Sequence, residues 1–350
     1  MKLKKLFAGV VAVAMMATMA MPSFAATSFT DNAMTASDSL TLTKIYEVTN
    51  DKTTTPEETF TFKITPQGSA PALAAGTDTK TVHLDAFTAT KNKDTTSGTF
   101  EIALSNLNIT RAGIYYYTLT EVDSNNGGVT TSRPLTMKVT AGYAHDGDTT
   151  LSYWVALREV GASDTNTDGS LNKENKVSAE EAFKNVYSAG ELTLTKTVKG
   201  AMGDKEQYFT FEVTLTGEAG KNYAGTYEVE YTARENTEGY ATNPTTIKIG
   251  EKTTFHLKHG DKIDIKNLPY NVAYTVNEVE ANQDDYKTTS EQSGEKVSAN
   301  AQIVAYTNTK GDESILDTGV ILDNAPYILM LAVVAGGAMT LVIKKRREEE

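Results

Sequence analysis

The chain of 350 residues contains no cysteine, so the disulfides that reinforce many exported proteins cannot form and no thiolate can act as a nucleophile. Positive charge is also scarce, because 33 lysines and arginines stand against 45 aspartates and glutamates. The formal net charge of −12 argues against a nucleic-acid binder. The sequence has no hydrolase-type serine motif and no glycine-rich phosphate loop, and it gives no support for an enzyme acting on an external substrate.

Long helical periodicity is missing from the middle of the chain. Threonine is abundant there, and tyrosine is common, with 17 tyrosines in the whole sequence. Both residue types favour strands. The composition therefore predicts an all-β protein.

The N-terminal residues 1–25 have the features of a secretory signal peptide. A basic start is followed by an apolar run over 6–21 and by the small residues Ser23 and Ala25 before a cleavage site. A membrane helix is the weaker alternative, because the apolar run is short. The sequence therefore predicts export.

The C-terminus carries a second targeting signal over 315–350. Ala325–Ile343 has no charge and would measure about 29 Å as a helix, close to the thickness of a bilayer's hydrocarbon core. Four basic residues follow it, and Ile-Leu-Asp-Thr-Gly precedes it at 315–319. This order resembles a Gram-positive sortase sorting signal, although leucine and aspartate stand where the motif usually has proline. A simple membrane anchor is the alternative.

Two segments of the chain begin with the same five residues, Leu-Thr-Leu-Thr-Lys, at 40–44 and 192–196. Each is predicted to form a strand that ends at its lysine. Because side chains alternate along a strand, Lys44 and Lys196 share a face with the leucines. An unpaired ammonium group is costly on an apolar face, so each lysine requires a partner in the core.

Each copy continues with a glutamate and then an asparagine. "GIYYYTLTEV" carries Glu121 and matches "NVAYTVNEV" with Glu278, while "AFKNVY" carries Asn185 and matches "VAYTNT" with Asn308. Alternation places all four residues on the apolar sides of their strands. Six inward polar residues in two matching sets are hard to explain as isolated hydrogen-bonded core groups.

The repeat also includes a pair of phenylalanines, in "ETFTFKI" after the first lysine and in "QYFTFEV" after the second. A period this long indicates two tandem domains rather than a solenoid. We place the domains at 37–187 and 188–310. The first unit is longer near its end and is predicted to carry an inserted loop.

A lysine, a glutamate and an asparagine in one dry core can react. Burial lowers the pKa of a lysine and favours the protonated form of a carboxyl group. The neutral amine can attack the side-chain carbonyl of asparagine while the carboxyl polarises the amide and relays protons; ammonia leaves, and an isopeptide bond remains. The alternative is a buried ion pair with a hydrogen-bonded asparagine and no reaction.

These features, from the signal peptide to the basic tail, resemble those of sortase-assembled Gram-positive major pilins. The resemblance implies tandem immunoglobulin-like β-sandwich domains, each with an autocatalytic Lys–Asn isopeptide bond promoted by a glutamate, and no cofactor. The residues that it assigns are Lys44, Asn185 and the promoting Glu121 in the first domain, and Lys196, Asn308 and the promoting Glu278 in the second.

The resemblance also implies that a pilus-specific sortase cleaves between Thr318 and Gly319. A lysine of the next subunit would then attack the acyl group of Thr318. Such a lysine lies shortly before the bonded asparagine in the resembling pilins, which points to Lys176 and, with a poorer match, to Lys173. The alternative is that both are ordinary solvated loop lysines.

Two possible metal sites are weaker. The segment 164–175 begins like a calcium loop, but Asn175 stands where a bidentate glutamate is expected, so a solvated loop is preferred. His256 and His259 are predicted to lie in one strand and to face opposite sides. No metal site is therefore expected.

The sequence as a whole predicts the shaft subunit of a covalent pilus, membrane-tethered before sorting and then anchored to the cell wall of a Gram-positive bacterium. The expected partners are a pilus-specific sortase, further copies of the chain, minor pilins, and peptidoglycan or its precursor, but no nucleic acid. The only reaction that the chain itself is expected to catalyse is the formation of its own internal cross-links. The alternative function is a wall-anchored adhesin or a minor pilin of the tip or base.

Overall fold

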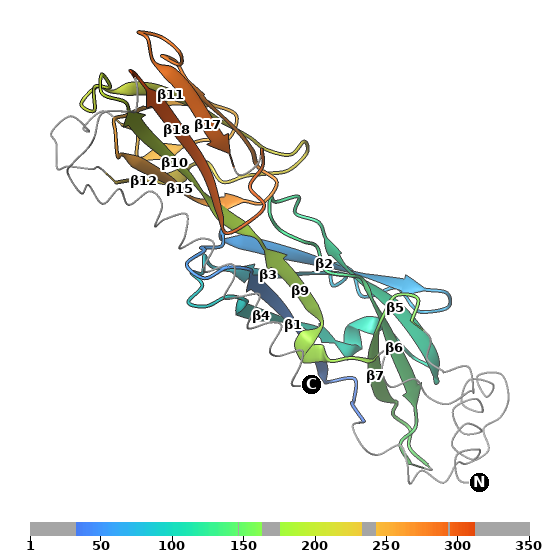
Figure 1. Ribbon diagram of the computed structural model, residues 1–350. Coiled ribbons are helices and arrows are strands. Elements are labelled where there is room, and N and C mark those ends of the chain that lie inside the picture. Colours follow the sequence, from blue (N-terminus) through green and yellow to red (C-terminus); the bar gives the residue numbers. More distant parts are fainter. Residues whose placement is uncertain (1–32, 146, 163–175, 233–242, 293–294, 312–350) are drawn as a thin grey trace.

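Figure 1 shows the computed structural model, which describes residues 33–145, 147–162, 176–232, 243–292 and 295–311. The predicted all-β fold is confirmed, because strands build two sandwiches that lie end to end in an elongated molecule (Figure 1). The described residues include two short 3-10 turns, at Leu104–Leu107 and Ala179–Glu181.

The first sandwich consists of a three-stranded and a six-stranded sheet. The three-stranded sheet has the order β4 (Asp94–Ala103), β1 (Ser39–Val48), β9 (Phe183–Tyr187). The six-stranded sheet has the order β3 (Thr79–Leu84), β2 (Glu58–Gln67), β5 (Gly113–Val122), β6 (Leu135–Gly142), β7 (Ser152–Glu159), β8 (Lys176–Val177). The first and last strands, β1 and β9, are parallel neighbours.

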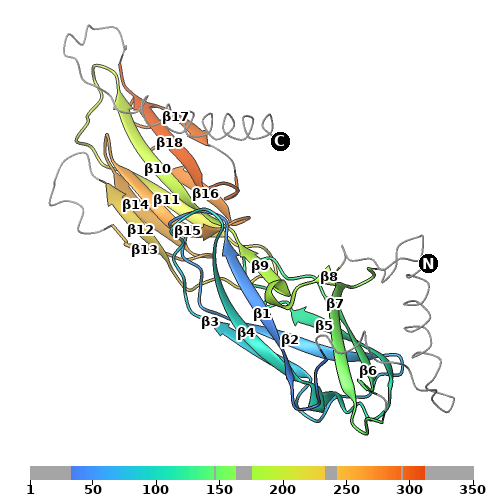
Figure 2. The same cartoon turned by 90° about the horizontal axis from the view of Figure 1, so that it is seen from below.

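The second sandwich has the same numbers of strands. Its six-stranded sheet has the order β13 (Thr246–Ile247), β12 (Tyr227–Thr232), β15 (Lys262–Pro269), β10 (Ala189–Lys199), β18 (Ala301–Thr309), β17 (Lys287–Gln292). Its three-stranded sheet has the order β14 (Lys252–Leu257), β11 (Phe209–Thr216), β16 (Ala273–Glu278). Again the first and last strands, β10 and β18, are parallel neighbours (Figure 2).

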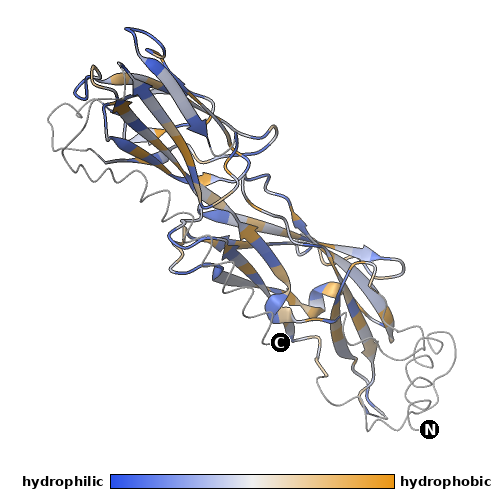
Figure 3. Ribbon diagram, viewed as in Figure 1, coloured by the Kyte–Doolittle hydropathy of each residue, from blue (hydrophilic) through white to orange (hydrophobic). Residues whose placement is uncertain are grey.

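Two separate cores fill the sandwiches. One is built from buried side chains between Leu42 and Ala189, and the other from side chains between Leu192 and Tyr306. Apolar and polar residues alternate along the strands, as the orange and blue bands in Figure 3 show. The alternation buries one face of each sheet against its partner sheet.

Two local predictions are wrong. The strands do not end at their lysines, because β1 continues to Val48 and β10 to Lys199. Buried Tyr46 and Val198 extend the inward pattern beyond each lysine and give the strands a reason to continue. The inserted segment of the first domain is also more than a loop, since β6, β7 and β8 prolong the six-stranded sheet.

Some predicted features lie outside the described residues. These are the signal peptide at 1–25 and the sorting signal and basic tail at 315–350. Within the part that the structure describes, no helix is long and apolar enough to cross a bilayer.

Candidate cross-linking sites

Lys44, Glu121 and Asn185 meet in the core of the first domain. Lys44 lies on β1 and Asn185 on the neighbouring β9, while Glu121 reaches them from β5 of the opposite sheet. Lys44 Nζ donates a hydrogen bond to Glu121 Oε2 at 2.7 Å, and Asn185 Nδ2 donates one to Glu121 Oε1. The three residues are 0, 5 and 1% exposed, so water is largely excluded from the group.

Lys196, Glu278 and Asn308 form the same arrangement in the second domain. Lys196 Nζ donates to Glu278 Oε2 at 2.7 Å, and Asn308 Nδ2 donates to Glu278 Oε1 at 2.5 Å. All three residues are buried. The structure thus brings together, in two separate cores, the six residues that the sequence singled out.

The strand register is identical in the two sites. Asn185 pairs with Tyr46, and Asn308 pairs with Val198, each of which follows the lysine by two positions. Residues two apart on a strand share a face. The lysine and asparagine side chains therefore project side by side into the core.

An aromatic ring lies against each lysine amine. Lys44 Nζ is 4.2 Å from the centre of the Phe60 ring, and Lys196 Nζ is 4.0 Å from that of Phe209. The rings exclude water and stabilise the ammonium form through cation–π attraction. Sequence reasoning used these phenylalanines only as markers of the repeat, although their matching positions after the two lysines already hinted at a shared role.

Burial makes both lysines unusually acidic. Desolvation lowers the pKa of Lys44 from 10.5 to about 8, with attraction to Glu121 opposing the shift. The pKa of Lys196 is likewise lowered to about 8 by desolvation, and its hydrogen bond to Glu278 opposes the shift. With a pKa of about 8, roughly a tenth of each amine is neutral at pH 7, far more than for an ordinary lysine.

The two sites differ at the oxygen of the asparagine amide. In both, the carboxylate contacts the amide nitrogen. In the first site, Ser132 Oγ donates to Asn185 Oδ1 at 2.5 Å. In the second, Asn308 Oδ1 is buried and has no hydrogen-bond partner among the described residues.

The other predicted site residues are mostly outside the described part of the chain. Thr318, Gly319 and Lys173 belong to this group. Lys176 is described, and it lies exposed on β8, the edge strand of the six-stranded sheet, where it pairs with Arg158. Its exposure leaves the amine accessible to another molecule.

The described residues contain no cluster of three or more histidine, aspartate or glutamate side chains that could hold a metal ion. The segment 164–175 lies outside the described residues. His256 is exposed on β14, but His259 follows the strand in a turn, where its Nδ1 accepts a hydrogen bond from Val198 N at 3.0 Å. The prediction that both histidines share one strand is therefore wrong.

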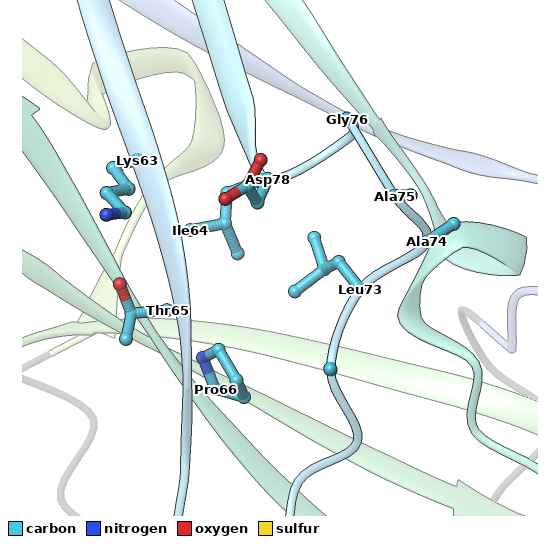
Figure 4. A pocket seen from close by; sticks show the side chains of 10 residues that line it. Lys63, Ile64, Thr65, Pro66, Leu73, Ala74, Ala75, Gly76 and Asp78 are labelled. Atoms are coloured by element: carbon cyan, nitrogen blue, oxygen red, sulfur yellow. The ribbon is translucent and has the colours of Figure 1, made fainter.

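A pocket of about 250 Å³ lies between β2 and the loop that follows it (Figure 4), and no triad residue lines it. Its lining is mostly small or apolar, with one lysine and one aspartate, Lys63 and Asp78. It offers no constellation of catalytic groups.

Comparison with known proteins matches these observations. Residues 40–188 match the family described as the Spy0128-like isopeptide containing domain, and residues 190–310 match a domain family of unknown function, DUF7601. A pilin from Streptococcus pyogenes serotype M1 is 27% identical over 349 residues, which cover 93% of this chain and 96% of that pilin. The chain is therefore similar to this streptococcal pilin over nearly its whole length.

Two further relatives show how far the similarity extends. The crystal structure of the major pilin from Streptococcus pyogenes superposes with a TM-score of 0.50 at 24% identity, covering 78% of this chain and 99% of that chain, and it supports the fold. The pilus tip adhesin Cpa of the same species is 32% identical over 97 residues, which are 28% of this chain and only 12% of the adhesin. The pilin is thus matched over nearly its whole length, and the adhesin over a small part.

Proposed function

We propose that the chain is the shaft subunit of a covalently polymerised pilus and that an isopeptide bond locks each of its domains. The observation that carries the proposal is the same buried Lys–Glu–Asn triad, in the same register, in both domains of a pilin homologue. If these residues served only to stabilise the core, well-packed apolar side chains would do so at a lower cost in free energy than two buried triads. Their repetition favours a chemical role.

The geometry suits bond formation without outside help. The neutral amine of Lys44 attacks Cγ of Asn185, and the electrons of the carbonyl double bond move to Oδ1. Glu121 takes a proton from Nζ through Oε2, and the carboxyl group then delivers that proton to Nδ2. The electrons on Oδ1 re-form the carbonyl as the Cγ–Nδ2 bond breaks, ammonia leaves, and the carboxylate is regenerated. Lys196, Asn308 and Glu278 react in the same way.

The bonds would reinforce a protein that has no disulfides. Each ties the first strand of a domain to the last, closing a loop of roughly 140 or 110 residues. By analogy with disulfides, such a link contributes about 5 kcal/mol to the free energy of unfolding.

The anchor and the polymer link complete the proposed function. A pilus-specific sortase cleaves between Thr318 and Gly319 and transfers the Thr318 acyl group to Lys176 of the next copy, or to peptidoglycan or its precursor. The subunit is then part of a fibre on the surface of a Gram-positive cell. Its export, its minor-pilin partners and its non-enzymatic role follow from the same assignment.

A wall-anchored adhesin or a minor pilin is the alternative. The match to the tip adhesin covers only 12% of that protein, whereas the match to the pilin covers 96%. These observations favour the shaft.

Intact-protein mass spectrometry tests the bonds. The mature protein should be lighter than its sequence by two ammonia molecules, and Asn185→Ala or Asn308→Ala should each restore the mass of one lost ammonia after correction for the substitution. A mass equal to that of the uncorrected sequence would refute the isopeptide assignment. Boiling wall extracts in detergent tests the shaft: a ladder of high-mass species indicates a polymer, and a single band would support the adhesin.

A further inference from the structure

The first site contains a hydroxyl group on the asparagine oxygen that has no counterpart among the described residues of the second site. Ser132 lies in the segment between β5 and β6, and its Oγ donates a hydrogen bond to Asn185 Oδ1 at 2.5 Å. The same Oγ accepts a hydrogen bond from Lys44 Nζ at 3.4 Å. The serine thus touches both the attacking nitrogen and the oxygen of the carbonyl under attack.

The segment that carries Ser132 is fixed to the strand that carries the asparagine. Thr130 N donates to Val186 O at 3.0 Å, and Val186 N donates back to Thr130 Oγ1 at 2.9 Å. Val129 forms a further bridge with Tyr187. The hydroxyl is therefore held in place before the reaction begins, as a stabilising donor must be.

We propose that Ser132 is a catalytic residue of the first cross-linking site, where its hydroxyl stabilises the negative charge that develops on Asn185 Oδ1. When Nζ attacks Cγ, the carbonyl electrons move to Oδ1, and the hydrogen bond from Oγ strengthens as the charge grows. The serine keeps its proton throughout, and Glu121 carries the proton from Nζ to Nδ2. This inference rests on the proposed isopeptide bond.

The second site has the same triad geometry without such a donor among the described residues, so the proposed role of Ser132 is to accelerate the reaction and not to make it possible. Asn308 Oδ1 has no hydrogen-bond partner among the described residues, although the Lys–Glu–Asn geometry is the same. Loss of the Ser132 hydroxyl should therefore slow the first bond and leave the second unchanged. Loss of one comparable donor in other enzymes lowers the rate by about a hundredfold or more, and we expect a decrease of at least about tenfold here.

Timed cell-free synthesis of the full chain tests the proposal. At each time, digestion and mass spectrometry give the fraction of chains that carry the Lys44–Asn185 link, and the Lys196–Asn308 link in the same molecules serves as the internal reference. Ser132→Thr and Ser132→Val introduce side chains of nearly the same shape, but only threonine retains a hydroxyl group. Counting only protease-resistant chains removes any effect of slower folding.

We expect Ser132→Thr to form the first link at nearly the wild-type rate and Ser132→Val to be at least about tenfold slower. Ser124→Ala is the matched control: it removes another hydroxyl of the same segment, which donates to Glu58 Oε1 at 2.6 Å but does not contact the triad. Equal rates for the Thr and Val variants, or equal slowing by Ser124→Ala, would overturn the role of Ser132. A wild-type chain without either link would instead refute the proposed function.

Discussion

At the scale of single residues, the proposed cross-linking depends on burial to turn an inert side chain into a nucleophile. An exposed lysine with its ordinary pKa is almost fully protonated at neutral pH. Lys44 is fully buried, and desolvation lowers its pKa to about 8, while Glu121 and the Phe60 ring keep the charged form from being lost entirely. The competing effects leave a small neutral fraction of the amine beside Asn185, which hydrogen-bonds to the same carboxylate.

The pH dependence of bond formation follows from this pKa. The reactive amine is the neutral form, and its fraction rises as pH approaches about 8 from below. The rate of the Lys44–Asn185 link should therefore rise about tenfold per pH unit below that value and level off above it. Timed synthesis in buffers from about pH 6 to 9 measures the profile, and a rate that falls with rising pH across this range would contradict the mechanism.

Asn185→Ala isolates the contribution of the bond to stability. The substitution prevents cross-linking but leaves the Lys44–Glu121 ion pair intact, so no buried charge is stranded. The free energy of unfolding of the first domain should fall by about 5 kcal/mol, with a lower melting temperature. Calorimetry checks this, and Asn308→Ala should affect only the second domain. An unchanged melting temperature in a variant whose mass shows that no ammonia is lost from the first domain would contradict the expected stabilisation by the bond.

At the scale of strands, the proposed bonds lie where a pulling force enters and leaves each domain. β1 and β9 are parallel neighbours, as are β10 and β18. Tension applied to the ends of a domain would shear these two strands past one another. A covalent bond between them carries the load, and the strands enclosed by the loop bear little of it.

Single-molecule stretching tests this load path. The wild-type chain should lengthen without an unfolding step from either domain. Asn185→Ala should add one step, because roughly 140 residues become extensible, equivalent to about 500 Å of chain. Asn308→Ala should give a shorter step of about 400 Å from roughly 110 residues. Steps of these lengths in the wild type would show that the bonds are absent or do not carry the force.

At the scale of the whole molecule, the chain passes from the first domain to the second almost without a break between strands. β9 ends at Tyr187, and β10 begins at Ala189, so the segment from Asn185 to Lys196 is almost entirely strand. Hydrogen bonds cross the junction: Asn50 Nδ2 donates to Tyr270 Oη at 3.1 Å, and Gly127 N donates to Asn222 O at 2.8 Å. Such a junction suits a subunit that transmits tension along a fibre.

Lys176 is the residue on which the polymer is expected to depend. It lies exposed on an edge strand, clear of both triads, so Lys176→Ala should leave folding and both internal bonds intact while abolishing the high-mass ladder. Immunoblots of wall extracts measure the ladder, and intact mass confirms the two lost ammonia molecules. Lys184→Ala is the control, because this exposed lysine pairs with Glu47 on the outer face of β9. A ladder that persists in a Lys176→Ala, Lys173→Ala double variant would move the link elsewhere.

The sequence by itself identified the all-β class and the six residues of the triads. It could do so because alternation is a local property of the chain: two residues of one strand either share a face or do not, whatever the strand packs against. The internal repeat then supplied the evidence that each set belongs together. The ends of β1 and β10 were misjudged, because a polar lysine inside an apolar pattern looks like its end.

Only the tertiary structure decided what the chain cannot encode locally. The lysine and asparagine strands belong to the three-stranded sheet of the first domain but to the six-stranded sheet of the second, with the glutamate strand opposite in both. Strand partners and register depend on contacts between distant segments. In the first domain, the inserted strands β6 to β8 extend the sheet that contains the glutamate strand β5. Ser132 stayed hidden for the same reason: it has no counterpart in the second repeat, and only the fold brings it to Asn185.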